Sequence, residues 1–194
     1  CALPLPATGL ICGTCLRKPP AFERVEAAWR YDFPLDSLIT RFKHQAQWPL
    51  GRLLGELLSH HLQHTFSEGL AKPDVLLAVP LSSRRLRLRG FNQAQMLARW
   101  LGHSLQLPVT EHLLQRTQDT PAQQKLSAAE RKRNLLQAFQ LGDPHAVAGR
   151  HVALVDDVLT TGATAEAIAR VLKKAGAARV DVYCLARTPS PGEH

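Results

Sequence analysis

Two adjacent carboxylates and a hydroxyl-rich turn lie within residues 152–164. Asp156 and Asp157 directly follow the apolar run 151–155, which predicts a buried strand. The turn after them, here named the threonine turn, consists of Thr160, Thr161, Gly162, Ala163 and Thr164. A turn that leads into a helix offers free backbone N–H groups and a positive dipole end, and its glycine lets the chain close round a phosphate. Carboxylates that accept sugar hydroxyls would stand beside these donors, so the segment predicts a ribose 5-phosphate site.

The alternative is that this segment has only a structural role, as a strand, turn and helix with a threonine cap and two surface aspartates. Strand–turn–helix units are common, but this order of apolar run, two acids and Thr-Thr-Gly-Ala-Thr is not, which favours function. Adjacent side chains on a strand point to opposite faces of the sheet. Asp156 and Asp157 would therefore share one task only if the strand ends there.

A run of arginines supplies a second set of candidate residues. Arg84 and Arg85, with Arg87 and Arg89, follow the short apolar run 75–79 and its terminating proline. Arginine forks match phosphate oxygens well, so we expect Arg84 and Arg85 to approach an anion such as pyrophosphate. Binding of a nucleic-acid backbone and a merely solvated basic segment stay open as alternatives.

Three of the four cysteines lie near the start of the chain. The spacing of Cys12 and Cys15 lets two thiolates share one tetrahedral zinc ion, and Cys1 could be a third ligand. The chain begins at Cys1 without a methionine, so we expect a fragment whose missing cysteine ligand lies upstream. The sequence therefore predicts Zn²⁺ in the full-length protein and an incomplete site in this chain.

The positive net charge of the chain favours an anionic binding partner. The 194 residues carry a formal net charge of +8, which suits nucleic acid, acidic lipid or polyphosphate metabolites. Hydrophobic residues make up 45% and charged residues 21%, as in ordinary globular proteins. No apolar run is long enough to cross a bilayer and no signal-peptide pattern opens the chain. We expect a cytoplasmic protein without a membrane partner.

The N-terminal part is predicted to have two pieces. Residues 1–24 are rich in Pro, Cys and Gly and lack periodicity, as in a small knuckle. A strand is predicted over 25–33, and helical spacing from 35 to 62 predicts two helices joined near Pro49. Residues 25–72 would thus form a strand and a helical cap.

The remaining residues, 73–194, predict an α/β core. Short apolar runs alternate with helical patterns, one of which begins at Asn92 as N-cap, and this alternation implies a parallel sheet flanked by helices. The polar stretch 115–134 predicts a long mobile loop. The strands are predicted at 75–79, 109–114, 151–155 and 179–185.

The sequence resembles one known family at several points. Residues 156–164 are similar to the phosphoribosyl pyrophosphate motif of type I phosphoribosyltransferases. Within that superfamily the chain resembles the competence protein F (ComF, GntX-like) family. The segments that carry this second resemblance are 84–93, 131–134 with Ala138-Phe139, 35–39 with Phe42-Lys43, and the Cys-rich start.

The resemblance implies a type I phosphoribosyltransferase fold and a role for each motif. Asp156 and Asp157 would be the catalytic acids and meet the ribose 2- and 3-hydroxyls, directly or through Mg²⁺, which prefers phosphate oxygens with one or two carboxylates. The threonine turn would hold the 5-phosphate, and the turn 80–85 would approach the pyrophosphate. The stretch 116–134 would be a flexible hood that excludes water.

Two functions stay open. The first is a glycosyltransferase reaction, in which phosphoribosyl passes to a nitrogen nucleophile with release of pyrophosphate, linked to competence and DNA uptake or to nucleotide salvage. The second is a non-catalytic module that senses phosphoribosyl pyrophosphate, or another ribose 5-phosphate, and acts on DNA or a partner from the competence machinery. A homo-oligomer is compatible with either function.

Overall fold

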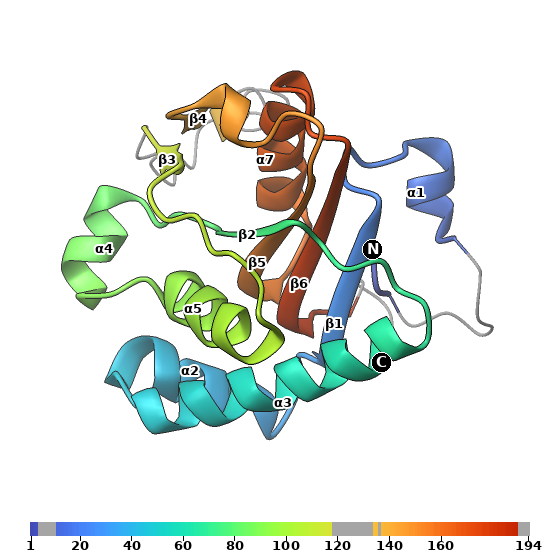
Figure 1. Cartoon of the computed structure of the whole chain (residues 1–194). Coiled ribbons are helices and arrows are strands. Elements are labelled where there is room, and N and C mark those ends of the chain that lie inside the picture. The colour runs from blue at the N-terminus through green and yellow to red at the C-terminus, as the bar shows by residue number, and fades with distance from the viewer. Residues whose placement is uncertain (4–10, 118–133, 136, 190–194) are drawn as a thin grey trace.

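A four-stranded parallel sheet forms the centre of the protein, in the order β1-β6-β5-β2 (Figure 1). The computed structural model of the 194-residue chain describes residues 1–3, 11–117, 134–135 and 137–189. The parallel sheet flanked by helices confirms the predicted α/β fold. The four strands are β1 (Arg24–Arg30), β2 (Val75–Ala78), β5 (His151–Leu159) and β6 (Arg179–Arg187).

Helices cover both faces of this sheet. One face packs against α2 (Leu35–Gln45), α3 (Trp48–Ser67) and α5 (Gln93–Leu105). The other face packs against α7 (Ala163–Lys174). Residues alternate between the two cores, and burial on both sides explains why the strands read as continuous apolar runs. Leu76, Ala153 and Val155 belong to the first core, whereas Leu77, Val152 and Leu154 belong to the second.

The predicted helical cap is confirmed in α2 and α3, and one close contact fixes how they pack. A Cβ atom at Gly51 of α3 would lie 2.4 Å from Cε2 of Phe42 in α2. The Phe42 ring is fully buried and stacks near Phe91 and Trp100, with ring centroids 5.8 and 6.1 Å away. The absence of a side chain at Gly51 therefore lets α2 lie close to α3 and beside α5.

The arginine run forms a helix rather than the predicted turn. Helix α4 (Ser83–Arg89) begins after Ser82, whose hydroxyl accepts a 3.3 Å hydrogen bond from the Arg85 N–H. It ends at Gly90, whose φ of 81° is left-handed. Arginine and leucine are good helix formers, so a Ser cap and a Gly stop suffice to define this helix. The predicted start of α5 at Asn92 is confirmed, because its Oδ1 accepts from the Ala94 N–H at 3.0 Å.

Several smaller elements differ from expectation. Strand β5 extends to Leu159, so both acids lie inside it. The strand predicted at 109–114 is shifted, since β3 (Leu114–Arg116) pairs antiparallel with β4 (Phe139–Leu141) and Val109 makes only an isolated bridge. A short 3-10 helix spans Pro144–Ala146. Most of the loop predicted at 115–134 lies outside the described residues.

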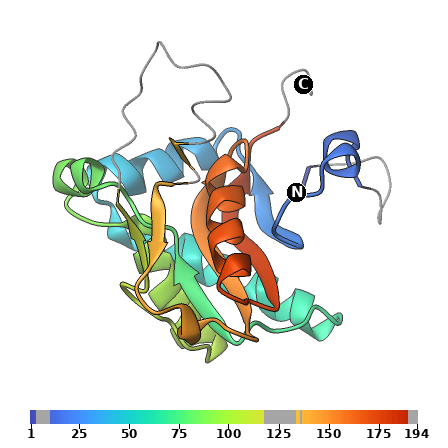
Figure 2. The same ribbon diagram turned by 90° about the horizontal axis from the view of Figure 1, so that it is seen from above.

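The Cys-rich start contains one helical turn. Helix α1 (Gly13–Arg17) lies beyond the β1 edge of the sheet in both views (Figures 1 and 2). Within the described part of the chain, no helix combines the length and apolar character needed to span a membrane.

Candidate functional site

The two adjacent acids point to opposite faces of the sheet. Asp157 follows the alternation of Ala153 and Val155 and faces the layer of α2, α3 and α5. Asp156 pairs in register with Cys184, which belongs to the core under α7. Because β5 continues past both residues, the alternation is kept and the two carboxylates have different surroundings.

Asp157 is held by a lysine from the helical cap. The Lys43 Nζ lies 3.0 Å from Asp157 Oδ1, and the two side chains are 18% and 6% exposed. The Val158 N–H donates to the same oxygen at 2.6 Å. The other oxygen, Oδ2, is buried and has no hydrogen-bond partner among the described residues. One carboxylate oxygen thus has two donors from the protein, while the second has none among the described residues.

A second cation lies near Asp157. Arg89, at the end of α4, is half-buried and donates a 2.5 Å hydrogen bond to the buried Gln93 side chain. Burial lowers the pKa of Arg89, and the opposite charge of Asp157 partly offsets this. The carboxylate therefore lies in a positive field supplied by the cap and by α4.

The Asp156 carboxyl tends to keep its proton. Burial, followed by the charge of Asp157, raises the pKa of Asp156 to about 8. The Asp157 N–H donates to its Oδ1 at 2.9 Å, which only partly compensates. At neutral pH the pair therefore holds one negative charge rather than two.

The threonine turn leads directly from β5 into α7. Thr160 and Thr161 are exposed, and Gly162 has a left-handed φ of 75° that favours glycine. The Thr161 hydroxyl accepts from the Ala163 N–H at 3.3 Å, while the N-cap residue Gly162 supplies no side chain to the helix end. The first N–H groups of a helix lack intrahelical acceptors, so this end of α7 can receive an anion.

Arg187 fixes the start of this turn, and sequence reasoning missed it. Its Nη1 donates to the carbonyl of Leu159 at 3.1 Å and also to that of Thr160. Its Nε donates to the carbonyl of Cys1 at 3.0 Å. The residue lies at the end of β6, and no motif marks it, because its partners come from distant parts of the chain.

Arg84 and Arg85 are exposed on α4. In the described part of the chain, no hydrogen bond or ion pair joins either side chain to Asp156 or Asp157. The structure instead brings Arg89 of the same run toward Asp157. The predicted hood at 116–134 lies almost entirely outside the described residues.

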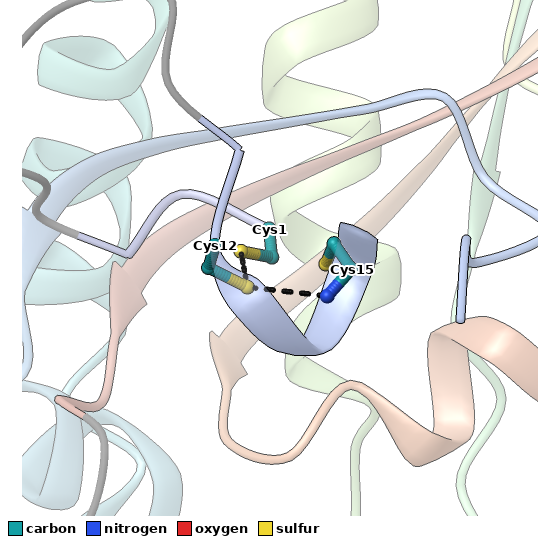
Figure 3. A group of neighbouring side chains, drawn as sticks. All are labelled: Cys1, Cys12 and Cys15. Carbon is teal, nitrogen blue, oxygen red and sulfur yellow. Dashed lines mark hydrogen bonds between the residues drawn. The ribbon is translucent and has the colours of Figure 1, made fainter. Parts of the chain in front are cut away.

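The three N-terminal cysteines come together at the start of α1 (Figure 3). We call Cys1, Cys12 and Cys15 the cysteine cluster; their sulfur atoms lie within 4.8 Å of one another. The Cys1 and Cys12 sulfurs are 3.4 Å apart, and the Cys15 N–H donates to Cys12 Sγ at 3.4 Å. That N–H lowers the pKa of Cys12, whereas burial and the Cys12 thiol raise the pKa of Cys15. Thiolates on one tetrahedral zinc lie about 3.8 Å apart, so this spacing fits three zinc ligands.

A cavity of about 700 Å³ joins the cysteine cluster to the threonine turn. Phe22, Glu166 and Arg187 line it together with residues of both sites. The backbone N–H of Ala21 donates to Glu166 at 2.7 Å and attaches the segment before β1 to α7. The two candidate sites therefore open into one shared space.

Comparison with known proteins identifies the family. The family described as phosphoribosyl transferase domain matches residues 57–194. The DNA utilization protein YhgH of Escherichia coli (strain K12) is 42% identical over 189 residues, which cover 97% of this chain and 82% of that protein. Competence protein F of Haemophilus influenzae is 37% identical over 178 residues, covering 91% of this chain and 78% of that protein. The chain belongs to the competence protein F branch of the phosphoribosyltransferase family.

The family match confirms the resemblance predicted from residues 156–164 and 84–93. A solved purine phosphoribosyltransferase from Pyrococcus horikoshii is 22% identical and covers 76% of this chain and 80% of that chain, with a TM-score of 0.44. In this competence protein F relative, the motif acids and the threonine turn lie at the carboxyl ends of parallel strands, the edge where α/β folds bind ligands.

Proposed function

We propose that this protein binds phosphoribosyl pyrophosphate at the carboxyl end of β5 and transfers its phosphoribosyl group to a nitrogen nucleophile. The observation that carries the proposal is the sequence of groups along one continuous segment. Asp156 and Asp157 on β5 are followed by the threonine turn and then by the uncapped end of α7. The family match supports this function, because the matched residues, 57–194, include this segment.

The two ends of the segment would bind different parts of the ligand. The 5-phosphate would accept hydrogen bonds from backbone N–H groups and hydroxyls of residues 160–164. The ribose hydroxyls would donate to the Asp157 carboxylate, whereas Asp156, which the resemblance implies for the same sugar, faces the opposite side of the sheet. Arg187 would contribute indirectly, since it holds the Leu159 and Thr160 carbonyls away from the phosphate.

In the reaction, the bond between the sugar C1 and the pyrophosphate oxygen breaks, a bond from C1 to nitrogen forms, and the nucleophile releases its proton. Developing negative charge on the leaving group requires nearby cations, and the half-buried Arg89, which lies near Asp157, is our candidate. Mg²⁺ takes most of its ligands from phosphate and sugar oxygens and needs only one protein carboxylate, so Asp157, whose Oδ2 is buried and unpartnered among the described residues, would be the one to hold it. The ribose hydroxyls would then meet this carboxylate directly or through the ion, and Mg²⁺ when bound would neutralise charge on the pyrophosphate.

Zinc is proposed for the cysteine cluster. Cys1, Cys12 and Cys15 supply three thiolates at a suitable mutual spacing, and a fourth ligand would complete a tetrahedral structural site. Zinc there would hold α1 against the Cys1 carbonyl that Arg187 contacts.

Isothermal calorimetry with phosphoribosyl pyrophosphate and Mg²⁺ tests the proposal directly. We expect saturable binding, and Asp156→Asn with Asp157→Asn should weaken it at least tenfold while circular dichroism stays unchanged. A following screen for pyrophosphate release with nitrogen bases would identify the acceptor. Equal affinity of wild type and double variant would show that the ligand does not use these acids.

A second candidate function is a non-catalytic module that senses the same ligand and acts on DNA. Helix α4 favours it, because Arg84, Arg85 and Arg87 are exposed beside the exposed Leu86 and Leu88. The names of the relatives refer to DNA utilization and competence. DNA affinity measured across salt, with and without the sugar ligand, tests this function: a steep salt slope supports it, and a flat one contradicts it.

A further inference from the structure

Lys43 forms a buried ion pair with Asp157; it lies in one of the segments that resemble the family, Phe42-Lys43, but the resemblance assigns it no role. It lies on α2, in the helical cap, yet its Nζ reaches Asp157 Oδ1 at 3.0 Å across the carboxyl edge of the sheet. The lysine side chain is only 18% exposed, so its charge is poorly screened by water. A lysine in such a position costs desolvation free energy and requires its partner carboxylate.

The contacts of Asp157 are divided unequally between its two oxygens. Oδ1 receives the Lys43 ammonium and the Val158 N–H, the latter at 2.6 Å. Oδ2 is buried and has no partner among the described residues. A buried carboxylate oxygen without a donor is costly, and such groups are typically completed by a ligand or water. The carboxylate is therefore held by one oxygen and offers the other.

The packing of α2 keeps the lysine in this position. Phe42 precedes Lys43 and inserts its ring into the space left by Gly51, where a Cβ would lie 2.4 Å from Cε2 of the ring. The same ring lies 5.8 Å from that of Phe91, which is close to Arg89 along the chain. The contact between Phe42 and Phe91 thus links Lys43 on α2 to the end of α4, where Arg89 lies.

From this geometry we propose that Lys43 is a positioning residue for sugar recognition: it orients Asp157 so that Oδ2 accepts a ribose hydroxyl. The proposal rests on the proposed function, because it assumes that the sugar of a ribose 5-phosphate lies at this edge. It adds a residue from the helical cap to a site whose other members come from the core. The charged neighbours of Asp157 are Lys43 on α2, Arg89 on α4 and Asp156 on β5.

Two probes separate the sugar from the phosphate. We would measure the dissociation constants of ribose 5-phosphate and inorganic phosphate for the full chain by amide chemical shifts. Wild type should bind ribose 5-phosphate more tightly than inorganic phosphate. The ratio of the dissociation constant of phosphate to that of ribose 5-phosphate therefore reports the contribution of the sugar. Lys43→Met should lower this ratio about tenfold, the order expected for one charge-assisted hydrogen bond, with the dissociation constant of phosphate unchanged. Lys43→Arg should restore most of it.

The controls address folding and charge. Arg41→Met removes a cation from an exposed position of the same helix and should leave both constants unchanged. Lys43→Met leaves Asp157 buried without its cation, so the variant Lys43→Met with Asp157→Asn provides a neutral pair that folds more readily. If Lys43 acts only through Asp157, this double variant should have the same sugar contribution as Asp157→Asn alone.

Each remaining outcome is decisive. If Lys43→Met weakened the binding of ribose 5-phosphate and of phosphate by the same factor, its role would be structural and the proposal would be overturned. An unchanged ratio, or weaker binding of inorganic phosphate alone, would place the lysine away from the sugar and overturn the proposal too. A wild type that binds phosphate and ribose 5-phosphate equally, or binds neither, would instead contradict the proposed function itself.

Discussion

The guanidinium of Arg187 donates a 3.0 Å hydrogen bond to the backbone carbonyl of Cys1. The same side chain donates to the carbonyl of Leu159 at 3.1 Å and to that of Thr160. The cysteine cluster and the threonine turn are therefore attached to one charged group at the end of β6. A shift in the position of one site should therefore shift the other.

Arg187→Gln is expected to weaken phosphate binding at the threonine turn. Its loss removes charge-assisted donors from four backbone carbonyls, those of Cys1, Leu159, Thr160 and Thr188. We therefore expect a lower free energy of unfolding, by about 1–3 kcal/mol, and several-fold weaker binding of ribose 5-phosphate. Urea denaturation and calorimetry measure the two effects. Arg170→Gln, which removes an exposed arginine paired with Glu166 on α7, is the matched control and should change neither much.

The stability of the protein should depend on pH through Asp156. Its pKa is about 8 in the folded protein against 3.8 in the unfolded chain, because burial and Asp157 disfavour the charged form. Between these values the folded state binds more protons, so the free energy of unfolding should fall as pH rises toward 8. Urea denaturation at several pH values measures this slope.

Asp156→Asn should flatten that dependence, because an amide does not titrate. Asp32→Asn, at an exposed residue, serves as control and should keep the wild-type slope. A slope equally steep in Asp156→Asn would assign the pH dependence to other groups.

Gly51→Ala should destabilise the protein, although alanine normally stabilises a helix interior by about 0.5–1 kcal/mol relative to glycine. The new Cβ would lie 2.4 Å from the ring of the fully buried Phe42, so the ring or α2 must move. We expect a loss of about 1–3 kcal/mol in urea denaturation. The combined variant Gly51→Ala with Phe42→Leu should lose less than the sum of the single losses, and strict additivity would argue against this contact.

Cys12 should be more reactive than Cys15 and Cys184. The Cys15 N–H lowers the pKa of Cys12, while burial raises the pKa of Cys15 and of Cys184. At neutral pH, iodoacetamide should therefore modify Cys12 before Cys15 and Cys184, as measured by peptide mass spectrometry. Added Zn²⁺ should protect Cys12 and Cys15 together but leave Cys184 unaffected, and protection of neither would contradict zinc binding by the cluster.

The order of elements and the position of the threonine turn could be predicted because their signals are local. Apolar runs predicted the four strands of the central sheet, the Asn92 cap predicted the start of α5, and Gly162 with the adjacent hydroxyls marked the entry to α7. Each of these signals depends only on residues that are close in the sequence, so the sequence alone is sufficient to predict these elements. Helix α4 departs from the predicted turn because the Ser82 cap and the helix-forming arginines and leucines after it extend the backbone into a helix.

What only the tertiary structure decided is which distant groups meet at these local motifs. The sequence placed Asp156 and Asp157 side by side, but the continuation of β5 sends them to opposite faces. The partner of Asp157 is Lys43, because Phe42 packs into the space at Gly51 and brings α2 over the sheet edge. Such contacts depend on how helices pack across long separations in the chain, and no local pattern of residues encodes that packing.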